Sequence, residues 1–182
     1  SKSMPDGQRQ IIDFALPGDF LDPRSADNAT SALQIEAVTS AVIAEIPNSL
    51  WHQLGETIPQ LKTLENRIIA GALSRLAERM LRLGKGSAEA RIAHAIIELC
   101  TRLRAVGQER DLSFHLPLTQ QQLGEFVGLS SVHVCRTMRR LKRLGVISME
   151  GQIDIIIHDM DALAEIAGVD PDMLETEIIP RL

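Results

Sequence analysis

The stretch from Thr119 to Leu144 constrains the fold of this chain more strongly than any other. Thr119 and Gln122 stand at the spacing of a capping box, which marks the start of a helix. Ser130 is a second candidate N-cap residue, and it follows directly after the Gly128-Leu129 turn. Two capped helices that flank a short glycine turn predict a helix-turn-helix motif.

The second helix of this motif has two chemically different faces. At about 100° per residue, Val134, Met138 and Leu141 fall on one side of the helix. The opposite side carries Val132, Arg136, Arg139 and Arg143. Between Ser131 and Gly145 the sequence has five Arg or Lys residues and no Asp or Glu, although the whole chain has a net charge of −5. We therefore expect one face to pack and the other to present positive charge.

A basic helix face on an acidic chain is typical of binding to DNA phosphates, because each neutralised phosphate releases condensed counterions. A basic face that only meets solvent is the alternative, and the capped turn in front of the helix favours DNA. The aromatic content of 3%, with no Tyr, argues against single-stranded nucleic acid, which binds on aromatic platforms. The predicted contacts to double-stranded DNA are Thr119, Gln120, Ser130, Ser131, Val132, His133, Cys135, Arg136, Arg139, Arg140 and Arg143.

Composition bounds the class of protein. A length of 182 residues allows one large or two small domains, and 45% hydrophobic residues allow well-filled cores. The sequence has no run of about 18 apolar residues and no charged-then-apolar leader, so we expect a cytoplasmic protein without a membrane span. Two cysteines, Cys100 and Cys135, are too few for a disulfide framework or a four-cysteine metal site, so we expect no metal-binding residues within this sequence.

The longest predicted helix begins at Pro59 and runs to about Leu83. Its apolar residues repeat at the 4, 3, 4, 3 spacing of a coiled-coil seam. They are Ile69, Leu73, Leu76, Met80 and Leu83, with Leu61, Leu64 and Ile68 upstream. At 1.5 Å per residue such a helix is roughly 36 Å long, more than a small neighbouring domain covers. Dimerisation through this helix is therefore predicted, and packing against its own domain is the alternative.

Residues 1–46 read as short strands joined by turns. Asp6-Gly7 signals a hairpin and Pro17-Gly18-Asp19 a further turn. Apolar runs at 33–37 and 41–46 are predicted as two more strands, and 47–54 as a short helix. These few strands predict a β-sandwich or roll of which this sequence contains only the later part.

A hairpin is predicted directly behind the helix-turn-helix. Gly145 is expected to end the second helix, and 146–149 and 152–157 are expected to pair as strands. A hairpin in this position is a wing. Asp159 caps a last predicted helix through Ala167, and Asp170-Pro171 opens a short acidic tail.

In this order of elements the sequence resembles the Crp/Fnr family of bacterial transcription regulators. The resemblance covers Pro5 to about Gly168. It is carried by Asp6-Gly7, Gln10 to Phe14, Pro17 to Phe20, Val42 to Ile46 and above all Leu118 to Gly145, with Gly151 in the wing. Family members have a complete N-terminal β-roll before the long helix. This chain holds about the second half of that roll, so we expect either a cut sequence or a naturally shortened relative.

The resemblance implies an α+β fold in four parts. Residues 1–58 would be a partial, cyclic-nucleotide-binding-like β-roll that acts as sensor domain, and 59–84 the dimerisation helix. Residues 85–168 would be a winged helix-turn-helix domain, and 169–182 a C-terminal tail. The resemblance also implies a homodimer with its two recognition helices in successive major grooves of a near-palindromic site, and RNA polymerase as a partner.

By resemblance, Arg136 takes the place of the arginine that reads guanine in this family. A guanidinium fits guanine O6 and N7 with two parallel hydrogen bonds, which lysine does not reproduce. The residue one turn before it, often Glu in the family, is Val132 here. Valine offers only apolar contact, for example to a thymine methyl group, so we expect the preferred DNA site to differ from that of the best-known members.

The sensor residues depart further from the family pattern. In cyclic-nucleotide-binding relatives, Pro-Gly-Asp-Phe is followed by a Gly-Glu-Leu segment and later by an Arg-Ser or Arg-Thr pair. Here the run continues through Leu21 to Ala26 in a shorter loop, Thr30-Ser31-Ala32 has no arginine before it, and Asp22 would repel a phosphate. We therefore expect no cyclic AMP binding. The cysteine cluster that holds iron–sulfur in oxygen-sensing relatives lies upstream of Ser1, so an iron–sulfur cofactor stays open.

The sequence also offers features of two other classes of protein, an enzyme and a module for protein contact. His133 and Cys135 are the residue types of a base and a nucleophile, but at i and i+2 they point about 160° apart on a helix, so no enzyme is expected. A winged helix used for protein contact is the remaining alternative.

Cys135 stands beside Arg136, where positive charge favours a thiolate, so redox control by oxidation of Cys135 is a hypothesis. A small residue that lets the helix approach the groove is the simpler interpretation.

Overall fold

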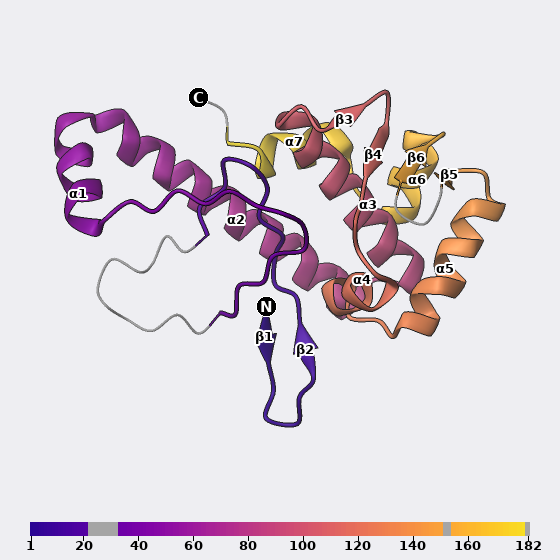
Figure 1. Cartoon of the computed structure of the whole chain (residues 1–182). Helices are drawn as coiled ribbons and strands as arrows, with labels where there is room; N and C mark the ends of the chain where they lie inside the picture. Colours follow the sequence, from indigo (N-terminus) through magenta and orange to yellow (C-terminus); the bar gives the residue numbers. More distant parts are fainter. Residues whose placement is uncertain (22–32, 151–153, 181–182) are drawn as a thin grey trace.

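The computed structural model describes residues 1–21, 33–150 and 154–180. It has an α+β fold in which one long helix joins the N-terminal part to a helical domain with a small sheet (Figure 1). The N-terminal part holds β1 (Lys2–Ser3), β2 (Arg9–Gln10), α1 (Asn48–Thr57) and α2 (Pro59–Lys85). The domain holds α3 (Ala88–Ala105), β3 (Glu109–Arg110), β4 (Ser113–His115), α4 (Gln120–Val127), α5 (Ser131–Arg143), β5 (Ile147–Glu150), β6 (Asp154–Ile157), α6 (Met160–Ala167) and α7 (Pro171–Ile178).

Helix α3 forms the centre of the core. Ser87 caps it by accepting a hydrogen bond from the Ala90 backbone N–H at 3.1 Å. Its apolar stripe is buried and consists of Ile92, Ile96, Leu99 and Leu103. α3 contacts α2, α4, α5, α6 and α7. Both helices of the predicted helix-turn-helix are therefore held on one shared support.

The sheet has the order β3-β4-β6-β5, and all neighbouring strands are antiparallel. The predicted wing hairpin is confirmed as β5 and β6, with Ile147 opposite Ile157. Its connecting residues 151–153, with the predicted Gly151, lie outside the described residues. β4 pairs with β6 and sets Phe114 opposite Ile155, and both side chains are buried. These buried side chains fix the wing to the core.

Helix α2 is confirmed as the long helix and has Pro59 in its first turn. Its buried residues are Gly71, Arg75, Arg79 and Arg82. Ile69, Leu73 and Met80 of the predicted seam are 44%, 66% and 72% exposed. The half-buried members of the predicted seam are Leu61, Leu64, Ile68, Leu76 and Leu83. The helix is thus polar on its inner face and apolar on its outer face.

The N-terminal part agrees only partly with expectation. The hairpin predicted at Asp6-Gly7 is confirmed, since β1 and β2 pair Lys2 with Gln10. The strands predicted at 33–37 and 41–46 are wrong: Gln34 exchanges hydrogen bonds with Ser1, but no strand forms there in the described residues. A strand needs a neighbour that satisfies its backbone groups and covers its side chains, and this segment is exposed instead.

Most of the predicted C-terminal tail forms a helix, at Pro171–Ile178. The helix through Ala167 is confirmed as α6, and Asp170 caps a further helix, α7. Leu174 and Ile178 of α7 are buried, and the helix packs against α2 and α3. Among the helices that the structure describes, none combines the length and apolar character needed to cross a membrane.

Candidate nucleic-acid interface

Thr119 and Gln122 form the predicted capping box at the start of α4. The Thr119 hydroxyl accepts a hydrogen bond from the Gln122 N–H at 3.1 Å, and the Gln122 side-chain oxygen accepts one from the Thr119 N–H at 2.9 Å. α4 ends at Gly128, whose φ of 67° lies in the left-handed region. Ser130 caps α5 by accepting a hydrogen bond from the His133 N–H at 3.3 Å. The helix-turn-helix is therefore confirmed.

The turn is packed tightly against its surroundings. A Cβ added to Gly124 would lie 2.3 Å from the Leu129 carbonyl oxygen, and one added to Gly128 would lie 2.5 Å from Leu83 of α2. Arg91 of α3 donates hydrogen bonds to the carbonyls of Gly128 at 3.3 Å and Leu83 at 2.8 Å. Leu83, predicted for the dimer seam, thus lies against the turn, and α2 ends where the helix-turn-helix bends.

The two predicted faces of α5 are confirmed. Val134 and Leu141 are fully buried, and Met138 is 7% exposed. On the opposite side Val132 is 65% exposed, and the arginines at positions 136, 139 and 143 are exposed as well. The buried face positions α5 on the core, which leaves the basic face available to a ligand.

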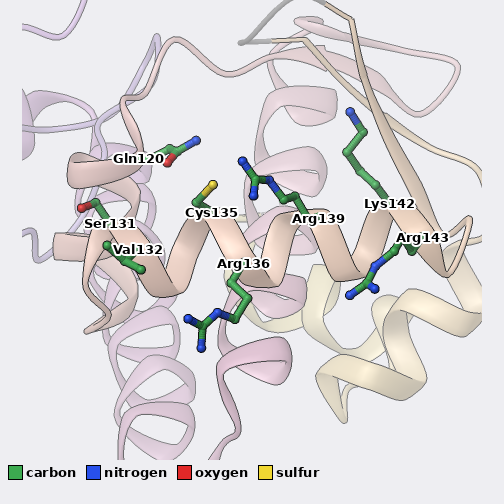
Figure 2. A pocket seen from close by; sticks show the side chains of 8 residues that line it. All are labelled: Gln120, Ser131, Val132, Cys135, Arg136, Arg139, Lys142 and Arg143. Atoms are coloured by element: carbon green, nitrogen blue, oxygen red, sulfur yellow. The ribbon is translucent and has the colours of Figure 1, made fainter.

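An open groove of about 860 Å³ runs along the exposed face of α5. Figure 2 shows side chains in two rows along it. One row consists of Gln120 from α4 and Cys135, Arg139 and Lys142 from α5. The other row consists of Val132, Arg136 and Arg143. Ser131 completes the lining at the start of α5.

Most of the positive charge in this groove is unmatched. Among the described residues, four of the five cations of α5 form no ion pair, and they are Arg136, Arg139, Lys142 and Arg143. The fifth, Arg140, pairs with Glu89 of α3 at 2.7 Å. Several positive charges that line one groove raise the local concentration of an anionic ligand. Arg140 adds less to this attraction because Glu89 already neutralises it.

The groove contains one residue that sequence reasoning missed and omits several that it named. Lys142 was not among the predicted contacts, although it belongs to the same acid-free run and lies only about 60° around the helix from Arg139. Thr119 and Ser130 use their hydroxyls as caps, and His133 Nδ1 lies 3.3 Å from Ser130 Oγ. Ser130 and His133 lie at the turn and Thr119 at the start of α4, and none of the three lines the groove.

The two cysteines occupy different environments. Both are free thiols. Cys100 is completely buried in α3, and burial raises the pKa of its thiol to about 11, so it is protonated and unreactive at neutral pH. Cys135 is half-buried in the groove beside Arg136. Redox control through Cys135 stays a prediction.

Some expectations concern parts that the structure does not place. Residues 22–26 and 30–32, on which the argument about cyclic AMP rests, lie outside the described residues. Within the part of the chain that is described, no three His, Cys, Asp or Glu side chains gather where they would hold a metal ion.

Comparison with known proteins singles out the same region. Residues 90–166 match the model of a family described as the Crp-like helix-turn-helix domain. The nitrogen fixation regulation protein FixK of Bradyrhizobium diazoefficiens is 35% identical over 170 residues, which cover 93% of this chain and 67% of the relative. The anaerobic regulatory protein of Pasteurella multocida is 31% identical and the transcriptional activator protein anr of Pseudomonas aeruginosa 30% identical, each over 162 residues or 89% of this chain.

The chain spans only 59% of the Pasteurella protein and 66% of the Pseudomonas protein. Among solved structures, FixK2 from Bradyrhizobium japonicum is similar with a TM-score of 0.69 and 22% identity, over 91% of this chain and 80% of that one, which shows a shared fold. By their names these relatives are regulatory proteins rather than enzymes, and the Pseudomonas protein is a transcriptional activator. The matched helix-turn-helix and the similarity to FixK along most of both sequences show that this chain belongs to the Crp/Fnr family of transcription regulators.

Proposed function

We propose that this chain regulates transcription by binding a specific double-stranded DNA site through α5. The observation that carries the proposal is the groove of Figure 2, which four cations of a single helix line without forming an ion pair to any described residue. Such a helix fits the major groove of B-DNA, whose walls are lined with phosphates. Because the whole chain has a net charge of −5, this local surface directs the binding.

The two ends of α5 would have different tasks. In helix-turn-helix proteins the N-terminal residues of the second helix reach the base edges. Here that end carries Ser131, Val132, Cys135 and Arg136. Arg136 would bind O6 and N7 of a guanine. The cations further along are Arg139, Lys142 and Arg143. These would bind phosphates, which orient the protein without reading the sequence.

The functional unit would be a homodimer paired through α2. Leu73 and Met80 are 66% and 72% exposed on a helix whose other face is buried. Large apolar side chains at coiled-coil spacing on an uncovered face support pairing with a second copy. A two-fold dimer suits half-sites one helical turn apart, about 34 Å, and therefore a near-palindromic site.

The signal side of the proposal rests on the sequence. Binding would need no cyclic AMP, because Asp22 would repel a phosphate and no arginine stands directly before Thr30-Ser31-Ala32. A bacterial regulator of transcription acts on DNA in the cytoplasm, and the family resemblance implies RNA polymerase as its partner there.

The test compares Arg136→Ala with Arg140→Ala on the duplex that the wild-type protein recovers from a random pool. Arg136→Ala should weaken binding by about 1 to 3 kcal/mol and relax the preference at one base pair. Arg140→Ala also removes one positive charge from α5, but this charge is already paired with Glu89 at the surface. This variant should therefore weaken DNA binding by less than about 1 kcal/mol. Fluorescence anisotropy at fixed salt measures both.

Two results would contradict the proposal. If Arg136→Ala bound the recovered duplex as tightly as the wild type, α5 would not read DNA, and a winged helix used for protein contact would be favoured. If the wild-type protein enriched no duplex from the pool, sequence-specific binding would be excluded.

Dimerisation is tested separately with Leu73→Glu. A carboxylate on the apolar face of α2 would have to be buried without a partner, so this variant should sediment as a monomer at concentrations where the wild type is a dimer. Met4→Glu is the matched control, since Met4 is 59% exposed but lies on the β1–β2 hairpin, and it should leave the dimer intact. A wild-type protein that sediments as a monomer throughout would rule the dimer out.

A further inference from the structure

Residues 9–19, which we call the strap, connect the N-terminal part to the first helix of the helix-turn-helix. The Ile11 N–H donates a hydrogen bond to the Glu125 carbonyl of α4 at 3.0 Å. The Arg9 guanidinium forms an ion pair with the Glu125 carboxylate at 2.7 Å. The Ile11 side chain is buried in the core. The strap is therefore bound to α4 by backbone, charge and apolar contact.

Phe126 of α4 joins the strap to α2. The Gln10 amide donates a hydrogen bond to the Phe126 carbonyl at 3.1 Å, and the rings of Phe14 and Phe126 lie 4.8 Å apart between centroids. The guanidinium of Arg79, from α2, lies 4.6 Å from the centroid of the Phe126 ring. A rotation of α4 relative to α2 would break these contacts together.

Asp13 is the acidic centre of the strap. Its carboxylate accepts hydrogen bonds from Arg75 of α2 at 2.9 and 3.0 Å and from Arg102 of α3 at 2.9 Å. It also forms an ion pair with Arg79 of α2 at 3.1 Å. Burial alone would raise the pKa of Asp13, but the guanidinium groups of Arg102, Arg79 and Arg75 outweigh it and hold that pKa below its ordinary value. One ionised carboxylate thus ties two helices to the strap.

The strap supplies two of the carboxylates that pair with the buried arginines of α2 and α3. Arg75, Arg79 and Arg102 are each less than 10% exposed. Asp19, the second acid of the strap, accepts a further hydrogen bond from Arg102 at 2.9 Å. Glu98 of α3 is a weaker partner, because its complete burial raises the pKa of its carboxyl group. Without the strap, these buried guanidinium groups would have too little negative charge around them, and a buried charge without a full partner is strongly unfavourable.

We propose that Asp13 is a positioning residue for DNA binding, which fixes the angle between the helix-turn-helix and α2 and so the separation of the two α5 helices in a dimer. This inference rests on the proposed function. One base pair shifts a half-site by about 3.4 Å and turns it by about 34°. A small change in the angle at the strap therefore changes which spacing of half-sites fits, while each α5 keeps its own contacts.

The experiment compares Asp13→Asn, which removes the charge at nearly constant size, with Asp13→Glu, which keeps the charge. The probes are the duplex recovered by the wild type, the same duplex with one or two base pairs added or removed between its half-sites, and a single half-site. Asp13→Asn should reduce the preference for the original spacing about tenfold and leave half-site affinity within about twofold of wild type. Asp13→Glu should retain most of the preference.

Each further outcome decides the proposal. Asp13→Asn that folds, dimerises and keeps the wild-type spacing preference would overturn it, as would an equal loss on half-site and full site. Where Asp13→Asn does not fold, Glu125→Gln decides, because it weakens the ion pair between strap and α4 while Asp13 stays in place. That variant should shift the spacing preference in the same direction, and no shift would overturn the proposal. Failure of the proposed function would be recognised separately, because the wild-type protein itself would then enrich no duplex from the random pool.

Discussion

Val132 lies next to Arg136 in the groove and is 65% exposed. Its side chain neither donates nor accepts hydrogen bonds, so in the proposed complex its contact with a base edge would be apolar. In the major groove of DNA, the apolar group on a base edge is the 5-methyl group of thymine. One arginine and one valine at the base-reading end of α5 therefore favour a site in which a thymine lies close to the guanine.

Replacing that thymine by uracil removes only the methyl group. We expect wild-type affinity to fall about fourfold, because burying a group of this size contributes about 0.8 kcal/mol. Val132→Ala is the control and should bind both duplexes with nearly the same affinity. Anisotropy titrations of duplexes that differ only in this methyl group measure the difference. A wild-type protein indifferent to uracil at every thymine of its site would exclude the contact.

At the scale of elements, Gly124 sets the geometry of the helix-turn-helix. Gly124→Ala should lower the free energy of unfolding by about 1 to 3 kcal/mol, because the new Cβ would lie 2.3 Å from the Leu129 carbonyl oxygen. Gly84, in the last turn of α2, has nothing within 4 Å of an added Cβ. Gly84→Ala should therefore stabilise the protein by up to about 1 kcal/mol. Urea denaturation distinguishes the two, and equal midpoints would contradict the steric argument.

The elements that were predicted correctly are those with local signals. Thr119, Gln122 and Ser130 act on backbone groups within three residues of themselves, so the capped helices could be predicted from the sequence. The strands at 33–37 and 41–46 were wrong because β-propensity describes how a side chain fits a neighbouring strand, and the described structure provides none.

The burial of the inner face of α2 could not be predicted either, because its partners are distant in the sequence. The apolar spacing identified the face that carries Leu73 and Met80, but not what the other face does. Arg75 is buried because its partner Asp13 approaches from 62 residues away in the sequence. Nothing in the spacing of α2 records that approach. Lys142 is the opposite case. It was not among the predicted DNA contacts, although the helix geometry alone places it in the groove.

At the scale of the whole molecule, a network of buried charge joins the strap, α2 and α3. His94 of α3 is 1% exposed at the edge of this network, with Nε2 3.8 Å from Glu78 and Nδ1 4.0 Å from Glu98. Burial, with the nearby Arg82 and Arg79, lowers the pKa of His94 to about 3. The imidazole is therefore neutral at physiological pH, and its contacts with the two carboxylates are not ion pairs.

This histidine makes stability depend on pH in a defined window. Below about pH 6.5 the unfolded chain takes up a proton at His94 that the folded chain refuses until about pH 3. The free energy of unfolding should therefore decrease as pH falls, by up to about 1.4 kcal/mol per pH unit. His94→Gln should show a smaller slope by about this amount in denaturation curves between pH 7 and 5. Glu98, whose pKa is raised, acts with the opposite sign in both proteins. Parallel slopes would exclude the effect.

Helix α2 turns Arg75, Arg79 and Arg82 inward and Leu73 and Met80 outward. In the proposed dimer, that outer surface is covered only when two copies meet, so the paired fraction rises with the number of molecules in the cell. The amount of the regulator would thus set a threshold for promoter occupancy before any signal reaches it.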